Sequence, residues 1–182
     1  PGHDPSVITV GSVNSKASNA RSDDLVNAFS SRGPTRGSYF DANGVRQVDN
    51  LLKPDLIAPG NKVLGSMWTD KAGGVWSWLA TSYPVLPYAR YSKSAVGSTL
   101  MYLSGTSIAA PAVAGTVALM LQANPGLTPP LIKAILQYSA QPIAGANLLQ
   151  QGAGMLNVDG AVRMARALRT DIAGAVEAGT IS

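Results

Sequence analysis

The spacing of hydrophobic positions changes partway along the chain and predicts two groups of elements. In the first third, apolar runs at 7–13 and 63–67 are rich in β-branched residues or bounded by Gly and Pro, which is typical of short buried strands. In the last 80 or so residues the apolar positions recur at helical spacing, over 107–123, from Pro129 onward, and from 157 or 158 to about 168. The first of these helices is almost entirely apolar, so we expect it to be buried on most sides. The other two are amphipathic and should lie on a core.

The connection from Trp68 to Ser98 shows no periodicity but is rich in aromatic residues, including all three Trp, Tyr83, Tyr88 and Tyr91. Long loops in compact domains are usually functional or disordered. An aromatic loop could line a substrate cleft, or it could pack as a small satellite cluster on the domain surface. We favour the satellite cluster, because nothing in the pattern places these rings along one face. Residues 170–182 resemble a tail or linker.

Composition excludes several functional classes. Only 13% of residues are charged, and the net charge of +4 is spread along the chain without a dense basic run, so nucleic-acid binding is not expected. There is no cysteine, which rules out disulfides and thiolate metal sites. The most apolar window, 108–121, is short for a membrane span and carries Pro111 and Gly115, so we predict no membrane segment. The start at Pro1, without a signal peptide, reads as the middle of a longer protein.

The segment from Leu100 to Gly115 carries the candidate chemistry. It passes from a strand-like run through Gly105 into the start of the apolar helix, and Ser107 lies at that helix N-terminus. Free N–H groups and the positive end of the helix dipole can stabilise an oxyanion there, and Gly105 lets a reacting carbonyl approach the backbone. From the residues alone, the alternative is that Ser107 only caps the helix, as serines commonly do.

The string Gly-Thr-Ser-x-Ala-Ala-Pro-x-Val-Ala-Gly over 105–115 resembles the serine motif of the subtilisin-like serine proteases (subtilases, peptidase family S8) at every defined position. Four further elements are similar to segments of the same family. They are Pro-Ser-Val-Ile-Thr-Val-Gly (5–11), Phe-Ser-Ser-Arg-Gly-Pro (29–34), Lys-Pro-Asp-Leu-Ile-Ala-Pro-Gly (53–60) and Gly-Ala-Gly-Met-Leu-Asn (152–157). The resemblance covers residues 1 to about 168.

The resemblance implies an α/β, subtilisin-like three-layer fold with a mostly parallel sheet, of which this chain is the incomplete, C-terminal portion. We expect residues 1–169 to form that part of the catalytic domain and 170–182 to be the tail or linker. It also implies peptide-bond hydrolysis by an Asp-His-Ser triad in a secreted or extracellular enzyme, with Ser107 as the nucleophile. The family's aspartate, histidine and oxyanion asparagine would all precede Pro1, because no Asp-Ser/Thr-Gly or His-Gly-Thr motif occurs here.

His3 is the sole histidine, and the resemblance places it in a loop before a strand, not at the triad position. We assign no triad role to any of the aspartates considered, which are Asp4, Asp23, Asp24, Asp55 and Asp159. The sequence has no histidine cluster and no calcium-loop pattern, so we predict no cofactor and no dedicated metal site.

Two hypotheses remain at this stage. In the first, the chain is part of a serine endopeptidase, nearly inert until an N-terminal part of the same domain supplies Asp, His and Asn for a peptide or protein substrate. In the second, it is a non-catalytic binding or structural module that retains the scaffold. Missing strands would leave an open sheet edge or an uncovered helix, so we also expect a complementing partner or self-association.

Overall fold

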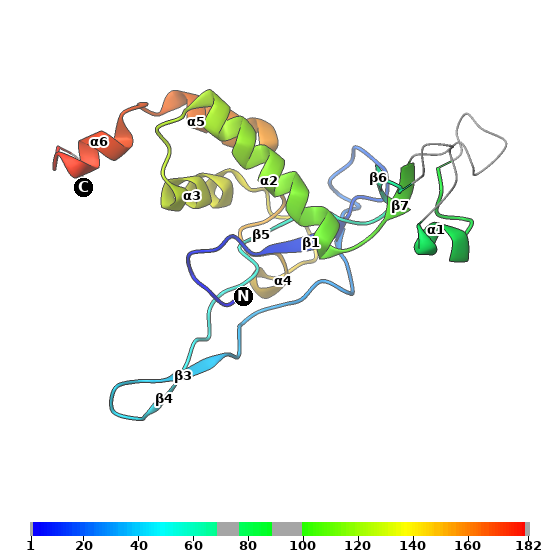
Figure 1. The fold of residues 1–182 in the computed structure, drawn as a ribbon, viewed down its shortest axis with the longest axis horizontal. Coiled ribbons are helices and arrows are strands. Elements are labelled where there is room, and N and C mark those ends of the chain that lie inside the picture. The colour runs from blue at the N-terminus through cyan, green and yellow to red at the C-terminus, as the bar shows by residue number, and fades with distance from the viewer. Residues whose placement is uncertain (1, 69–76, 89–99, 181–182) are drawn as a thin grey trace.

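A computed structural model describes residues 2–68, 77–88 and 100–180 of the 182-residue chain (Figure 1). Strands dominate the first half and helices the second, as the hydrophobic spacing predicts. In chain order the elements are β1 (Val10–Asn14), β2 (Leu25–Val26), β3 (Ser38–Phe40), β4 (Arg46–Val48), β5 (Leu56–Pro59), β6 (Val63–Ser66), α1 (Trp78–Ser82), β7 (Leu100–Leu103), α2 (Thr106–Ala123), α3 (Pro129–Ser139), α4 (Leu148–Gln151), α5 (Val158–Ala167) and α6 (Ile172–Glu177).

The central sheet has the order β2-β1-β5. Strands β1 and β5 run parallel, in register from Val10 opposite Leu56 to Val13 opposite Pro59. Strand β2 pairs antiparallel only with the C-terminal end of β1, at Val13 and Asn14. Residues Val10 to Ser12 therefore have no strand beside them on the edge opposite β5, within the part of the chain that the structure covers.

Apolar clusters lie on both faces of this sheet. On one face Leu56 and Ala58 pack with residues of α2, α3 and α5, and on the other Val13 and Ile57 pack with Ile143 and Met155. Figure 1 shows α2, α3 and α5 together on one side of β1 and β5, with α4 on the other side. A strand that is buried on both faces needs a continuous apolar run, which accounts for the sequence Leu-Ile-Ala at 56–58.

Helix α2 differs from the prediction that it is buried on most sides. Only one stripe of the helix is buried, at Ala109, Val113, Thr116 and Met120. The outer side is apolar and exposed, with Leu119 at 46%. The sequence predicted a helix covered on most sides, but the residues described here cover just one of them.

Strand β1 begins later than the predicted run 7–13. Val7 is 39% exposed, and its carbonyl accepts hydrogen bonds from the side chains of Lys53 and Lys133. The Thr9 N–H donates to the Asp55 carboxylate at 2.7 Å. The Thr9 carbonyl in turn accepts from the Asp55 N–H at 2.8 Å. Backbone contact with the segment before β5 therefore begins at Thr9, regular strand pairing begins at Val10, and lysine side chains are the partners of the Val7 carbonyl.

The predicted satellite cluster in the aromatic-rich connection lies partly outside the described residues, since 69–76 and 89–99 are among those not described. In the described part, Met67, Ala80 and Met101 form a small buried cluster beneath α1. The large rings are not its buried members: Trp78 is 74% exposed and Tyr83 is 53% exposed. The cluster exists, but aliphatic and methionine side chains form it.

Strands β3 and β4 form a hairpin that projects from the rest of the molecule and was not expected from the sequence (Figure 1). All six strand residues are exposed. The hairpin is therefore outside the core that positions α2.

The C-terminal residues contain a short helix, α6, whose Ile172 belongs to the main core cluster. Asn124, at the end of α2, is fully buried and its Nδ2 donates to the carbonyl groups of Ala165, Leu168 and Arg169. This contact fixes the end of α5 against the end of α2. The division into 1–169 and 170–182 stays a prediction.

Gly152 provides a stability test of the fold. It ends α4 at a φ of 59°, and an added Cβ would meet the backbone carbonyl groups of Pro54 and Asp55. We expect Gly152→Ala to lower the free energy of unfolding by about 2–3 kcal/mol, as strain and a clash with rigid backbone combine. Gly145, at a φ of 74° with open space around it, is the matched control. Gly145→Ala should cost only about 1 kcal/mol in urea unfolding, and equal losses would contradict the packing argument.

Candidate active site

Ser107 lies in the first turn of α2, just after β7. The N-cap of the helix is Gly105, so Ser107 is the second helical residue and is exposed. The structure therefore removes the alternative that this serine is simply the N-cap. Its hydroxyl is available for chemistry at the end of a helix that is anchored in the core.

Two turns that are far apart in sequence hold the start of α2 in place. The Gly105 N–H donates to the Gly60 carbonyl at 2.8 Å. The Ser104 hydroxyl donates to Asn61 Oδ1 at 3.1 Å and accepts from the Lys62 N–H at 2.9 Å. An added Cβ at Gly60 would meet Ser12 Oγ and the Gly105 carbonyl, so only glycine fits between these turns.

The backbone N–H groups at this helix end differ in whether they have an acceptor. The N–H groups of Ile108 and Ala109 both bond to the Gly105 carbonyl, at 3.0 and 3.2 Å. The Ser107 N–H has no acceptor among the described residues. A free N–H at a helix N-terminus, supported by the helix dipole, can donate to a developing oxyanion.

A hollow of about 720 Å³ lies beside Thr106. Its walls come from the N-terminal segment, the start of β1, the loop before the hairpin, and the residues that precede β5. The residues that line it are Gly2, His3, Thr9, Val10, Gly11, Ser31, Arg32, Gly33, Pro34, Thr35, Arg36, Lys53, Pro54 and Thr106. Thr106, the neighbour of Ser107, thus lines an open space.

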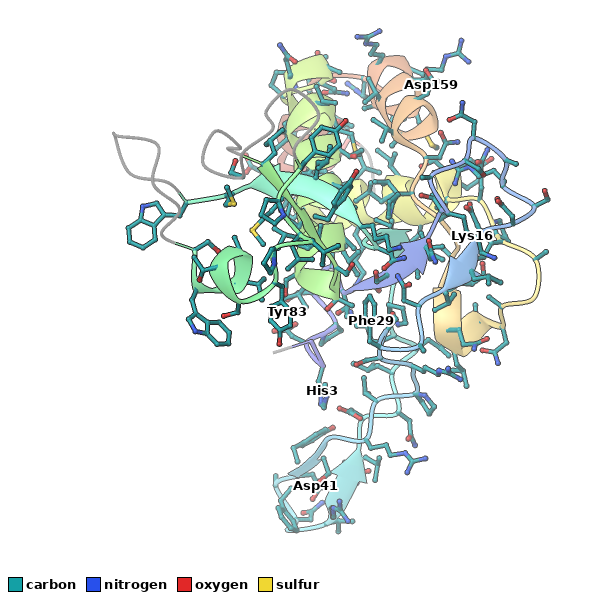
Figure 2. All side chains as sticks on the ribbon, turned by 90° about the vertical axis from the view of Figure 1, so that its right-hand side faces the viewer. His3, Lys16, Phe29, Asp41, Tyr83 and Asp159 are labelled. Atoms are coloured by element: carbon teal, nitrogen blue, oxygen red, sulfur yellow. The ribbon has the colours of Figure 1, made fainter. Side chains whose placement is uncertain are left out.

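His3 is engaged away from Ser107. Its Nδ1 lies 3.4 Å from Asp49 Oδ2, at the base of the β3–β4 hairpin, and its side chain is 61% exposed. Figure 2 shows His3 on the N-terminal segment toward the hairpin whose turn carries Asp41, far from Asp159. The structure thus gives the single histidine a hairpin carboxylate as its partner.

The five aspartates considered from the sequence all have other neighbours. Asp4 accepts from Ser6, Asp23 accepts from Ser18, and Asp24 faces Arg21; Asp55 pairs with Lys53 and Lys133, and Asp159 with Arg163. None of these carboxylates is paired with an imidazole in the described part of the chain. Within those residues, the site is an exposed serine with a free N–H and without an imidazole base beside it.

The described ranges contain no group of three or more His, Asp or Glu side chains that could hold a metal ion. Sequence reasoning did not find the partnership of Lys133 with Asp55. The two residues are far apart in sequence, and no pattern in the sequence pairs them.

Asp24 is a buried carboxylate with an unsatisfied oxygen. Its side chain is 1% exposed, Arg21 is 4.0 Å away, and Oδ2 has no hydrogen-bond partner among the residues described. Burial raises the pKa of Asp24, repulsion from Asp23 raises it further, and Arg21 opposes the shift. The charged form is therefore disfavoured in the folded state.

This shift predicts a pH-dependent gain from Asp24→Asn. The folded state loses stability as pH rises above the ordinary aspartate value of 3.8, and the whole penalty is present above the raised folded pKa. We expect Asp24→Asn to add about 1 kcal/mol to the free energy of unfolding at pH 7, and progressively less as pH falls toward 3.8. Urea unfolding at several pH values measures this, with the exposed Asp159→Asn as the control. A loss of stability at pH 7 would contradict it.

Comparison with known proteins agrees with this geometry. A family model described as the subtilase family matches residues 1–161. Serine protease AprX of Bacillus subtilis is 32% identical over 166 residues, which are 89% of this chain and 31% of that protein. Subtilisin-like protease SBT2.4 of Arabidopsis thaliana is 36% identical over 116 residues, 64% of this chain and 11% of that protein.

Solved structures confirm the predicted fold class. Fervidolysin from Fervidobacterium pennivorans, a keratinolytic enzyme related to subtilisin, aligns with a TM-score of 0.60 and 26% identity, over 90% of this chain and 20% of its own. The CspB protease of Clostridium perfringens aligns with a TM-score of 0.57 and 26% identity, over 91% of this chain and 29% of its own. The chain spans about a third or less of the length of each of these relatives.

Proposed function

The chain belongs to the subtilase family of serine proteases, and we propose that its Ser107 is the nucleophile for hydrolysis of peptide bonds. The observation that carries the proposal is the placement of Ser107, in an intact family motif, at an exposed helix start with a free N–H beside it. A serine hydroxyl is a weak nucleophile unless a general base takes its proton. His3 lies beside Asp49 at the foot of the hairpin, away from Ser107. The general base that takes the serine proton therefore comes from outside this chain.

We propose that an N-terminal part of the same protease domain completes the site. It would supply the aspartate, the histidine and the oxyanion asparagine, and it would lie in the hollow beside Thr106. On this edge of β1 the Ser12 N–H and carbonyl already bond to Ser30 Oγ and the Asn27 N–H, and Val10 has no strand beside it among the described residues, so an added strand could pair there. The chain alone would then be inactive or nearly so, and secretion remains a prediction from the family resemblance.

The outer face of α2 supports the same partner. From 110 to 121 its exposed residues are all Ala, Pro, Gly or Leu, without a charge. By length and composition α2 could also cross a membrane, with a mean hydropathy of 1.4 over 18 residues and 22% of that window buried. A single such helix is weak evidence for a span, since core helices have the same composition. Family membership favours a protein layer over this face.

Labelling with a fluorophosphonate probe tests the proposed function. We expect the 182-residue chain to react slowly or not at all, and to be labelled at Ser107 once the upstream part of the protein is present. Strong labelling of the chain alone would show that the base is not missing. No labelling of the folded, complete domain would instead favour a non-catalytic module.

The α2 face makes a separate prediction about association. We expect Leu119→Lys to weaken binding of the chain to the upstream part at least 10-fold, because a buried ammonium group without a partner is costly. Leu148→Lys on α4, where the leucine is 56% exposed, is the matched control and should bind normally. Titration followed by light scattering measures both. Equal binding by the two variants, or uptake of the parent chain into phosphatidylcholine vesicles, would contradict the assignment of this face.

A further inference from the structure

A buried ionic cluster joins Asp55 to two lysines. Asp55 Oδ2 lies 2.8 Å from Lys53 Nζ, and Oδ1 lies 3.1 Å from Lys133 Nζ. The side chains are 4%, 7% and 17% exposed, in the order Asp55, Lys53, Lys133. The carboxylate also accepts from the Thr9 N–H at 2.7 Å and from Gln137 Nε2 at 3.4 Å. Each oxygen of Asp55 therefore has two partners.

The remaining donors of both lysines point to one stretch of backbone. Lys133 Nζ donates to the carbonyl of Pro5 at 2.7 Å and to that of Val7 at 3.0 Å. Lys53 Nζ donates to the same Val7 carbonyl at 3.0 Å. The cluster thus ties residues 5–9, which form neither a helix nor a strand before Val10, to the start of β5 and to α3.

The lysines of this cluster supply the hydrogen-bond donors that the carbonyl groups of Pro5 and Val7 need. Two ammonium groups and one carboxylate leave an excess positive charge in a place where charges are costly. Apolar side chains could join β5 to α3 at lower cost, but they could not bond the free carbonyl groups of Pro5 and Val7. The lysines therefore do what packing alone would not do, which is to fix the backbone path of residues 5–9.

The segment that contains residues 5–9 contacts the surroundings of Ser107 at both of its ends. Gly2 and His3, at the beginning of the segment, line the hollow beside Thr106, and β1 at its other end packs against α2. We propose that Lys133, acting with Lys53, is a positioning residue: it fixes residues 5–9, and with them the wall that Thr9 gives to the hollow beside Thr106, and so sets where the preceding chain approaches the Ser107 site. The inference rests on the proposed function and extends it to residues that do not touch the reacting atoms.

The test compares Lys133→Met with the parent in the complete protease domain, well below the melting temperature. We expect the rate constant for fluorophosphonate labelling of Ser107, and kcat for a peptide substrate, to fall about 10- to 100-fold with KM little changed, because small displacements of a site are costly to rate. Lys16→Met is the control and should label like the parent, since Lys16 is exposed and its side chain forms no hydrogen bond or ion pair with the described residues. Labelling of folded Lys133→Met at the parent rate would overturn the proposal.

Hydrogen exchange in the 182-residue chain is an independent test. In Lys133→Met we expect the amides of residues 6–9 to exchange at least 10-fold faster, while those in the middle of α2 are unchanged. Unchanged protection at residues 6–9 would overturn the proposal whatever the activity. If the complete parent domain is folded but not labelled, the proposed function fails, and the exchange rates alone decide whether the lysines fix this segment.

Discussion

Ser107→Ala abolishes fluorophosphonate labelling and peptide hydrolysis by the complete protease domain: this is the largest effect that we expect of any substitution. Loss of the triad serine in subtilisin lowers kcat about a million-fold, and the same dependence follows here if Ser107 is the attacking group. The hydroxyl faces solvent at the helix start, so its removal should leave the fold intact. Mass spectrometry of the labelled protein, together with a fluorogenic peptide assay, measures both results.

Ser104→Ala is the control for this experiment. Ser104 lies in the same turn, but its hydroxyl bonds to Asn61 and Lys62 and so has a structural role. We expect this variant to keep its labelling, with at most a modest loss of rate as the turn loosens. Labelling that survives Ser107→Ala, or that moves to another serine, would refute the assignment of the nucleophile.

Asp55→Ala should produce the largest loss of stability. Removing the carboxylate leaves two largely buried ammonium groups without their shared anion, and the Thr9 N–H without its acceptor. Breaking a buried ion pair by removing one partner costs about 3–5 kcal/mol, which is a large share of the stability of a domain. Urea unfolding followed by circular dichroism measures the loss.

Asp159→Ala is the surface counterpart. Asp159 pairs with Arg163 at 3.5 Å, but both side chains are 78% exposed, and exposed pairs contribute about 0–1 kcal/mol. A loss at Asp55 no greater than the loss at Asp159 would mean that the buried cluster is solvated and does not hold the segment.

The sequence predicted most of the elements that depend on residues close together in the chain. The motif around Ser107, the strand-to-helix passage and the start of α3 at Pro129 all follow from residues that are close together, and the structure has each of them. The predicted start of β1 was wrong, because lysine side chains bond the Val7 carbonyl and the Asp55 carboxylate bonds the Thr9 N–H. Hydrophobic spacing cannot show such long-range polar contacts.

The predicted burial of α2 was also wrong, for a different reason. Its apolar composition predicts burial on most sides, but among the described residues only the stripe at Ala109, Val113, Thr116 and Met120 is buried. Composition alone cannot show which segment covers each side of a helix. The absence of a histidine partner for Ser107 was predictable, since His3 is the single imidazole in the sequence.

The bond between Gly105 and Gly60, and those of Ser104 to Asn61 and Lys62, lie wholly within this chain. The helix start that carries Ser107 is therefore held by contacts within this chain. Under the proposed function, such a chain would serve as one half of a split reporter: fused to one of two interacting proteins, with the upstream part on the other, it would convert their encounter into a covalent, fluorescent mark on Ser107. Background labelling would then be set by the reactivity of the chain alone, and signal by how often the two halves meet.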